Sequence, residues 1–167
     1  MNQFELEDLD PAEVLTYRHE FSATPEEIYG AFLDPKLFVQ WFGPKEWKVI
    51  PSTLTMEPVT GGRQQFVMRH TVNPKYQAPM YMRFIEMKEP TLIEYREALP
   101  TPQGKPSDTL VALRISIEPG TAITEDGVGE GTIVTLTQGP LPEAAQEHSR
   151  ESWVGSFESL AALLKKA

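Results

Sequence analysis

Cysteine is absent from this 167-residue chain, and histidine is scarce, with three residues. Without cysteine, the chain can form no disulfide framework, no thiolate zinc site and no catalytic thiol. Positive charge is also in short supply, because 15 Lys and Arg residues stand against 24 Asp and Glu residues, for a net charge of -9. This balance argues against nucleic acid as a partner, since phosphate binding requires a basic face. It argues equally against an anionic membrane surface.

Long apolar runs are missing as well, and none approaches the ~20 residues that a membrane-spanning helix needs. The N-terminal sequence MNQFELEDLDPAE is acidic and lacks the apolar stretch of a secretory signal, so we expect a cytoplasmic protein without membrane insertion. The hydrophobic content of 40% is that of a globular domain. We expect an acidic arm over residues 1–12 and one domain over residues 13–167.

Alternating apolar and polar residues predict strands, and Gly, Pro and Asn residues separate them. The predicted strands cover residues 14–21, 47–57, 63–71, 76–88, 91–98, 109–118 and 132–138. Between the last two, residues 120–131 hold four glycines and are expected to form a long, mobile loop.

Three helices are predicted from capping residues and apolar periodicity. Thr24-Pro25-Glu26-Glu27 starts the first, Asp34-Pro35 separates it from the second, and Gly43-Pro44 ends the second. A final helix of about two dozen residues begins near Pro142 and carries one apolar stripe at i, i+4, i+7 and i+11. The stripe consists of Trp153, Phe157, Leu160 and Leu164.

The order of these elements predicts an α+β architecture. One strand is followed by two short helices, six strands and a long helix, without the alternation that a parallel sheet requires. Seven antiparallel strands must bury one face, and the last helix is the large partner available for it. A sheet curled around one helix leaves a cavity between the two, which is a natural place for a ligand.

Several motifs resemble those of a known family. The run from Phe21 to Tyr29 resembles the first strand-to-helix junction of the START-like (SRPBCC, Bet v 1-like) superfamily. Asp34-Pro35 with Trp41-Phe42-Gly43-Pro44, and the Gly61-Gly62-Arg63 hairpin, resemble bacterial proteins similar to the C-terminal domain of the activator of Hsp90 ATPase. The closing helix contributes His148, Trp153, Gly155, Ser156 and Leu160, and the likeness runs from about residue 14 to residue 164.

The resemblance implies the helix-grip fold, in which seven antiparallel strands hold the C-terminal helix over a hydrophobic pocket. It implies a pocket more firmly than a reaction, because members of one fold serve different functions. The chain departs from the family pattern at Phe42, where the family often has a second tryptophan. It departs again at Val59-Thr60, where a basic residue is common.

The candidate ligand-binding residues are aromatic, methionine and histidine side chains on the predicted inner face or beside it. They are Trp41, Phe42, Met68, His70, Met82, Phe84, His148 and Trp153. Methionine adapts to irregular apolar ligands, and histidine can orient a polar group. The three histidines lack metal-ligand spacing, so we expect no metal. The sequence has no phosphate-cradling loop and no obvious catalytic triad, so we expect no cofactor and assign no catalytic residue.

The leading hypothesis is a module that binds a small apolar or amphipathic molecule. One alternative is a cyclase- or hydrolase-like enzyme that uses His148 or His70 with help from Tyr81. Another is a co-chaperone-like partner of an Hsp90-type chaperone, which we favour less. A further alternative is a homodimer formed through an exposed sheet edge.

Overall fold

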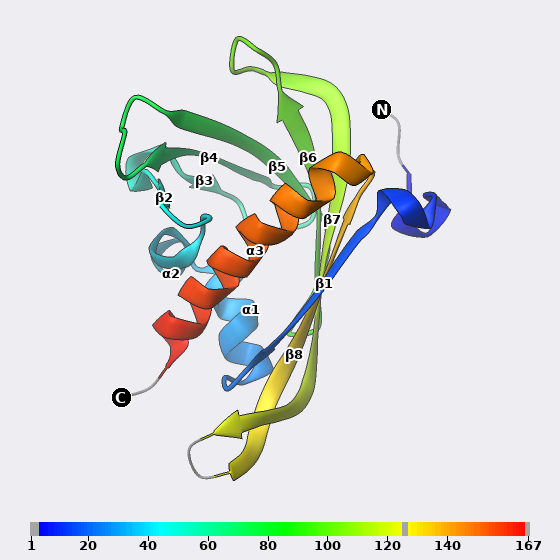
Figure 1. The fold of residues 1–167 in the computed structure, drawn as a ribbon, viewed down its shortest axis with the longest axis vertical. Helices are drawn as coiled ribbons and strands as arrows, with labels where there is room; N and C mark the ends of the chain where they lie inside the picture. The colour runs from blue at the N-terminus through cyan, green and yellow to red at the C-terminus, as the bar shows by residue number, and fades with distance from the viewer. Residues whose placement is uncertain (1–3, 125–126, 166–167) are drawn as a thin grey trace.

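The computed structural model describes residues 4–124 and 127–165. Within them, eight antiparallel strands form one strongly curled sheet (Figure 1). The strands are β1 (Leu15–Phe21), β2 (Trp47–Val49), β3 (Thr55–Met56), β4 (Arg63–His70), β5 (Gln77–Lys88), β6 (Leu92–Pro100), β7 (Pro106–Thr124) and β8 (Gly127–Gly139). The helices are α1 (Pro25–Leu33), α2 (Pro35–Trp41) and α3 (Glu143–Leu164).

The hydrogen-bonded strand order is β1-β8-β7-β6-β5-β4-β2, which confirms the predicted seven-stranded antiparallel sheet. The short β3 also pairs with β4 and makes the eighth strand. It arises because the predicted strand over residues 47–57 is interrupted by a 3-10 turn at Pro51–Thr53. Proline fixes its φ angle and has no N–H to donate to a ladder, so the strand breaks there.

The prediction of a loop over residues 120–131 is wrong for residues 120–124 and 127–131, which lie in strands. Residues 125 and 126 lie outside the described residues. β7 and β8 stay paired from Pro119 opposite Thr132 to Thr124 opposite Gly127. Two of the glycines meet close neighbours, because a Cβ on Gly120 would lie 2.7 Å from the Ile133 side chain and one on Gly131 would lie 2.5 Å from the carbonyl oxygen of Phe21. Glycine in this hairpin therefore permits close packing of strands, which is one of its ordinary roles.

The two short helices form as their capping residues predict. Thr24 Oγ1 accepts a hydrogen bond from the backbone N–H of Glu27, and the Glu27 carboxylate accepts one from the N–H of Thr24, both at 3.1 Å. Asp34 caps α2 by accepting from the N–H of Lys36 at 2.9 Å. These local contacts fix where the chain leaves β1 and where it returns to the sheet.

The long helix α3 crosses the concave side of the sheet, with α1 and α2 beside it (Figure 1). Its predicted stripe faces the sheet, and Phe157 and Leu160 are fully buried. They pack in one core with Phe84, Ile115 and Leu136 of the inner sheet face. The predicted helix grip is therefore confirmed.

The N-terminal segment lies on the opposite, convex side of the sheet. It forms two 3-10 turns, Leu6–Asp8 and Pro11–Glu13, and buries Leu6. One of its carboxylates has a partner on the sheet, because Glu7 pairs with Arg114 of β7. The acidic arm is thus docked onto the sheet.

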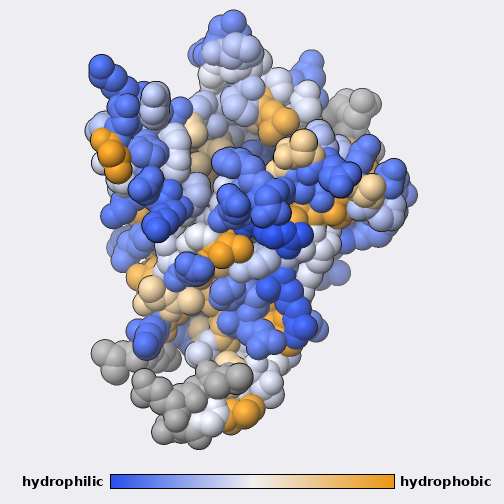
Figure 2. Space-filling model, in the orientation of Figure 1, coloured by the Kyte–Doolittle hydropathy of each residue, from blue (hydrophilic) through white to orange (hydrophobic). Residues whose placement is uncertain are grey.

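The surface seen from the α3 side is mostly hydrophilic, with hydrophobic residues in small separate groups (Figure 2). None of the described helices is both long enough and apolar enough to cross a membrane.

Candidate functional site

A cavity of about 570 Å³ opens between α3, the loop after α2 and the inner face of the sheet. Its wall combines aromatic, methionine and polar side chains. The lining residues are Phe42, Pro44, Lys45, Trp47, Met68, Ala78, Met80, Glu97, Gln138, His148, Ser149, Glu151, Ser152, Trp153 and Ser156. We call this space the concave cavity.

The loop after α2 approaches α3 closely because small residues meet there. Gly43 has φ 130°, a conformation that favours glycine, and a Cβ on it would lie 2.8 Å from the carbonyl oxygen of Trp47. Its N–H donates to Ser156 Oγ at 3.3 Å, and a Cβ on Gly155 would already lie 3.1 Å from the backbone nitrogen of Lys45. This contact sets one rim of the concave cavity.

Two polar side chains of α3 donate hydrogen bonds to Gln138, which lies on β8. Gln138 Oε1 accepts hydrogen bonds from Ser149 Oγ at 2.5 Å and from Trp153 Nε1 at 3.3 Å. Trp153 also meets Phe42 edge-on, with ring centroids 5.7 Å apart. The α3 side of the cavity wall is therefore held in place by contacts with β8 and with the loop after α2.

Glu97 on β6 differs from these groups. Its residue is 9% exposed, and burial raises the pKa of its carboxyl group to about 7. Its neighbours across the sheet are Met82 and Val111, neither of which carries a charge. Among the described residues, no side-chain hydrogen bond or ion pair reaches its carboxyl group, although a buried carboxylate normally has such a partner. Glu97 therefore supplies an uncompensated acid to the cavity wall.

Other charged or titratable side chains of the cavity lie at its edge. Lys45 and His148 are exposed on the loop and on α3, and Glu151 is exposed one turn after His148. The mouth of the cavity thus carries both signs of charge, while its interior carries the Glu97 carboxyl group.

Four of the predicted ligand-binding residues lie on the wall of the concave cavity: Phe42, Met68, His148 and Trp153. Two others lie in the core. Trp41 is buried and donates from Nε1 to the carbonyl oxygen of Ala31 at 2.9 Å, and Phe84 packs on Tyr95 with ring centroids 5.0 Å apart.

The remaining two predicted residues, Met82 and His70, do not line the concave cavity, and Met82 instead contributes to a second hollow. Met82 is buried next to Glu97, and its sulfur lies 3.9 Å from Gln64 Nε2. His70 ends β4, where its Nδ1 accepts a hydrogen bond from the N–H of Asn73 at 3.0 Å. Its ring also contacts Trp47, with centroids 5.1 Å apart, so His70 supports the turn after β4.

Glu97 was absent from the candidates, although strand parity could have found it. Ile93, Tyr95 and Glu97 alternate in the predicted strand over residues 91–98, and the first two are large and apolar. The same parity places the carboxylate on the inner face. No sequence pattern predicted that Gln138 and the serines of α3 would line the cavity, because their placement depends on how the helix crosses the sheet.

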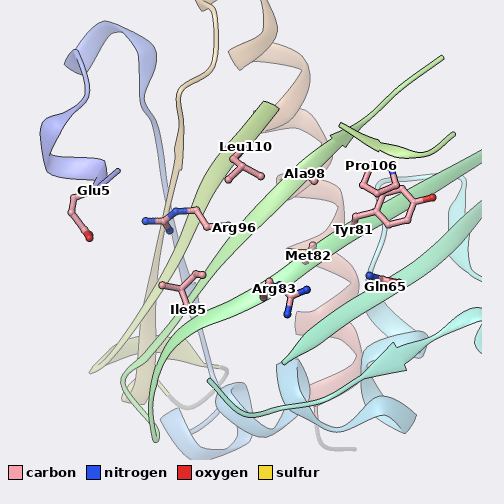
Figure 3. Close-up of a pocket in the computed structure, with 10 residues that line it drawn as sticks. All are labelled: Glu5, Gln65, Tyr81, Met82, Arg83, Ile85, Arg96, Ala98, Pro106 and Leu110. Carbon is pink, nitrogen blue, oxygen red and sulfur yellow. The ribbon is translucent and has the colours of Figure 1, made fainter. Parts of the chain in front are cut away.

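A second hollow of about 210 Å³ lies on the convex face, between the N-terminal arm and the sheet (Figure 3). Tyr81, Ala98 and Leu110 contribute to its wall, and the Tyr81 hydroxyl donates to the carbonyl oxygen of Gly104. Tyr81 and His148 therefore line hollows on opposite faces of the sheet. The structure therefore does not bring Tyr81 and His148 together as the acid–base pair of the enzymatic hypothesis.

Arg96 faces the same convex side and is buried. Its guanidinium bonds to Glu94 Oε2 at 2.9 Å and to the carbonyl oxygen of Phe4 at 2.5 Å, and it lies 5.0 Å from the centre of the Phe4 ring. The groups that contact the Arg96 guanidinium thus belong to the protein itself. In the described ranges, no three His, Asp or Glu side chains gather as a metal site requires.

A seven-strand path curled around a C-terminal helix, with two short helices after the first strand, defines the START-like helix-grip class. The family model described as "Activator of Hsp90 ATPase homolog 1-like protein" matches residues 22–165, and the chain belongs to this family. No curated protein matches the sequence.

Solved structures share the fold. The AHSA1 protein from Silicibacter pomeroyi is 18% identical, with a TM-score of 0.76 over 90% of this chain and 96% of its own. A protein from Arthrobacter aurescens is 19% identical, with a TM-score of 0.73 over 97% and 89%. A protein from Chromobacterium violaceum is 21% identical, with a TM-score of 0.71 over 93% and 99%. At these identities, the likeness concerns the fold alone.

Proposed function

We propose that the protein binds a small, largely apolar molecule in the concave cavity. The observation that carries the proposal is the cavity itself, whose volume of about 570 Å³ falls within the range of ~300–1,000 Å³ typical of ligand sites. Phe42, Trp47, Met68 and Trp153 supply apolar and aromatic wall on two sides.

Burial of apolar surface would drive binding, at ~25 cal/mol per Å² before the costs of association. The methionines suit ligands of irregular shape, because their side chains have no branch and bend easily. The fixed aromatic contact between Phe42 and Trp153 would give the cavity a rigid side. The polar groups would orient the ligand.

Two alanine positions on the same sheet allow a matched test. Ala78 lines the concave cavity, and Ala98 lines the convex hollow; both are half-buried. We expect Ala78→Trp to weaken binding of the neutral dye Nile red at least tenfold, because the indole fills the cavity. Ala98→Trp should leave the affinity unchanged.

Dye fluorescence gives the affinities, and circular dichroism checks that both variants are folded. Native mass spectrometry of gently purified protein adds the mass of any retained molecule. A folded Ala78→Trp variant that binds the dye as the unmodified protein does would contradict the proposal.

The enzymatic and co-chaperone hypotheses remain alternatives. The cavity does not bear on a chaperone partner, and the structure separates Tyr81 from the cavity histidine. Binding is therefore the function that the geometry supports best.

A further inference from the structure

Glu97 is a charge-bearing group without a compensating partner in the part of the chain that the structure describes. It lies on the wall of the concave cavity, is nine-tenths buried, and has no hydrogen-bonding or ionic partner among the residues described. A buried carboxylate without a partner destabilises a protein, so such groups are usually paired or replaced. An unpaired acid that faces a ligand-sized space indicates a partner that arrives with the ligand.

We propose that the ligand of the concave cavity is a hydrophobic amine, whose ammonium group pairs with the Glu97 carboxylate. This inference rests on the proposed function, because it names the chemistry of the ligand for the same cavity.

The rest of the wall fits a cation attached to an apolar body. Phe42, Trp47 and Trp153 present aromatic rings, and ring faces attract ammonium groups. The net charge of -9 favours the approach of a cation over that of an anion. A carboxylic acid would instead bring a second negative charge to Glu97.

The other titratable groups of the cavity do not replace this partner. Lys45, His148 and Glu151 are exposed at the mouth, where water screens them. The residues that flank Glu97 on neighbouring strands are Met82 and Val111. An ammonium group beside Glu97 would therefore meet a carboxylate in apolar surroundings, where an ion pair is strong.

The pairing predicts a dependence of affinity on pH. Burial raises the pKa of Glu97 to about 7, whereas an alkylamine stays protonated up to about pH 10. Between pH 6 and pH 8, the ionised fraction of Glu97 rises about tenfold, and the affinity for an amine should rise by the same factor. The affinity for a neutral ligand should not.

The test uses naphthylethylamine and its neutral analogue naphthylethanol, which compete with Nile red for the full-length protein at pH 6 and pH 8. The variants are Glu97→Gln and, as the control, Glu118→Gln. Glu118 is exposed on β7 and lines neither hollow, so it loses the same charge away from the cavity.

We expect Glu97→Gln to weaken amine binding at pH 8 at least tenfold and to remove its rise with pH. Binding of the alcohol should change less than twofold, and Glu118→Gln should resemble the unmodified protein. If amine and alcohol bind equally and Glu97→Gln affects neither, the amine inference is overturned while the proposed function stands. If the dye and both competitors fail to bind, the amine inference and the proposed function are overturned together.

Discussion

Two glutamates on β6, only three residues apart, meet opposite surroundings. Glu94 faces the convex side, where its carboxylate bonds to Arg96 Nη1 at 2.9 Å and to Arg114 Nε at 2.7 Å. Glu97 faces the concave cavity and has Met82 and Val111 beside it. Both residues are at least nine-tenths buried, so burial alone does not distinguish them.

The difference shows that the fold compensates a buried carboxylate on the convex side of the sheet, at Glu94. On the convex side, the N-terminal arm extends the network, since Glu7 reaches Arg114 and Phe4 covers Arg96. A fully paired carboxylate serves the folded structure. An unpaired one destabilises it, which is the pattern of a group kept for binding.

The largest effect is expected from Glu94→Ala. The change leaves the buried Arg96 without its carboxylate partner and leaves Arg114 with Glu7 alone, and removing one partner of a buried ion pair costs about 3–5 kcal/mol. Urea unfolding at neutral pH measures this loss. Glu118→Ala serves as the control on an exposed site, and a loss at Glu94 no greater than at Glu118 would refute the structural role of the network.

A smaller, opposite effect is expected from Glu97→Gln. Because the folded-state pKa of Glu97 is raised to about 7, the folded protein keeps a proton that the unfolded chain releases. Stability due to this group is therefore present at low pH and is lost as the pH rises towards 7, by about 2 kcal/mol between pH 5 and pH 8.

The glutamine variant lacks this titration. Its free energy of unfolding, relative to that of the unmodified protein, should thus rise by the same amount over this interval. Urea unfolding at both pH values gives the comparison. A difference that stays constant with pH would mean that Glu97 ionises normally in the folded state.

The smallest effect is expected from Phe4→Ala on the convex side. It removes the ring that lies 5.0 Å from the Arg96 guanidinium, and a contact of this kind contributes about 0.5–1 kcal/mol. Thermal or urea unfolding can detect the loss when Val59→Ala, a change at an exposed apolar residue, is run beside it. Equal stabilities of the two variants would show that the arm rests on the sheet without stabilising it.

Elements specified by adjacent residues were predictable. The caps of α1 and α2 at Thr24 and Asp34 need only the next few residues, and the structure has them as expected. The stripe of α3 follows from helical periodicity. The hairpin of β7 and β8 was missed because its glycines resembled a loop, whereas Gly131 meets the backbone of Phe21, which is distant in sequence.

For the candidate site, sequence reasoning placed Phe42, Met68, His148 and Trp153 near the inner face, and they line the cavity. Trp41 and Phe84 share the chemistry of those residues, but packing assigns them to the core. The separation of Tyr81 from His148 depends on which face of β5 turns towards α3.

By itself, the sequence determined the fold class, the order of the elements and the residues that begin and end the short helices, because periodicity and capping act over a few positions. Only the tertiary structure decided that Glu94 is paired with two arginines, whereas Glu97 has no side-chain partner within residues 4–124 and 127–165. Their partners, or the lack of them, come from β5, β7, α3 and the N-terminal arm, which meet β6 only when the sheet curls around its helix. Charge compensation of a buried group is a property of that assembled environment.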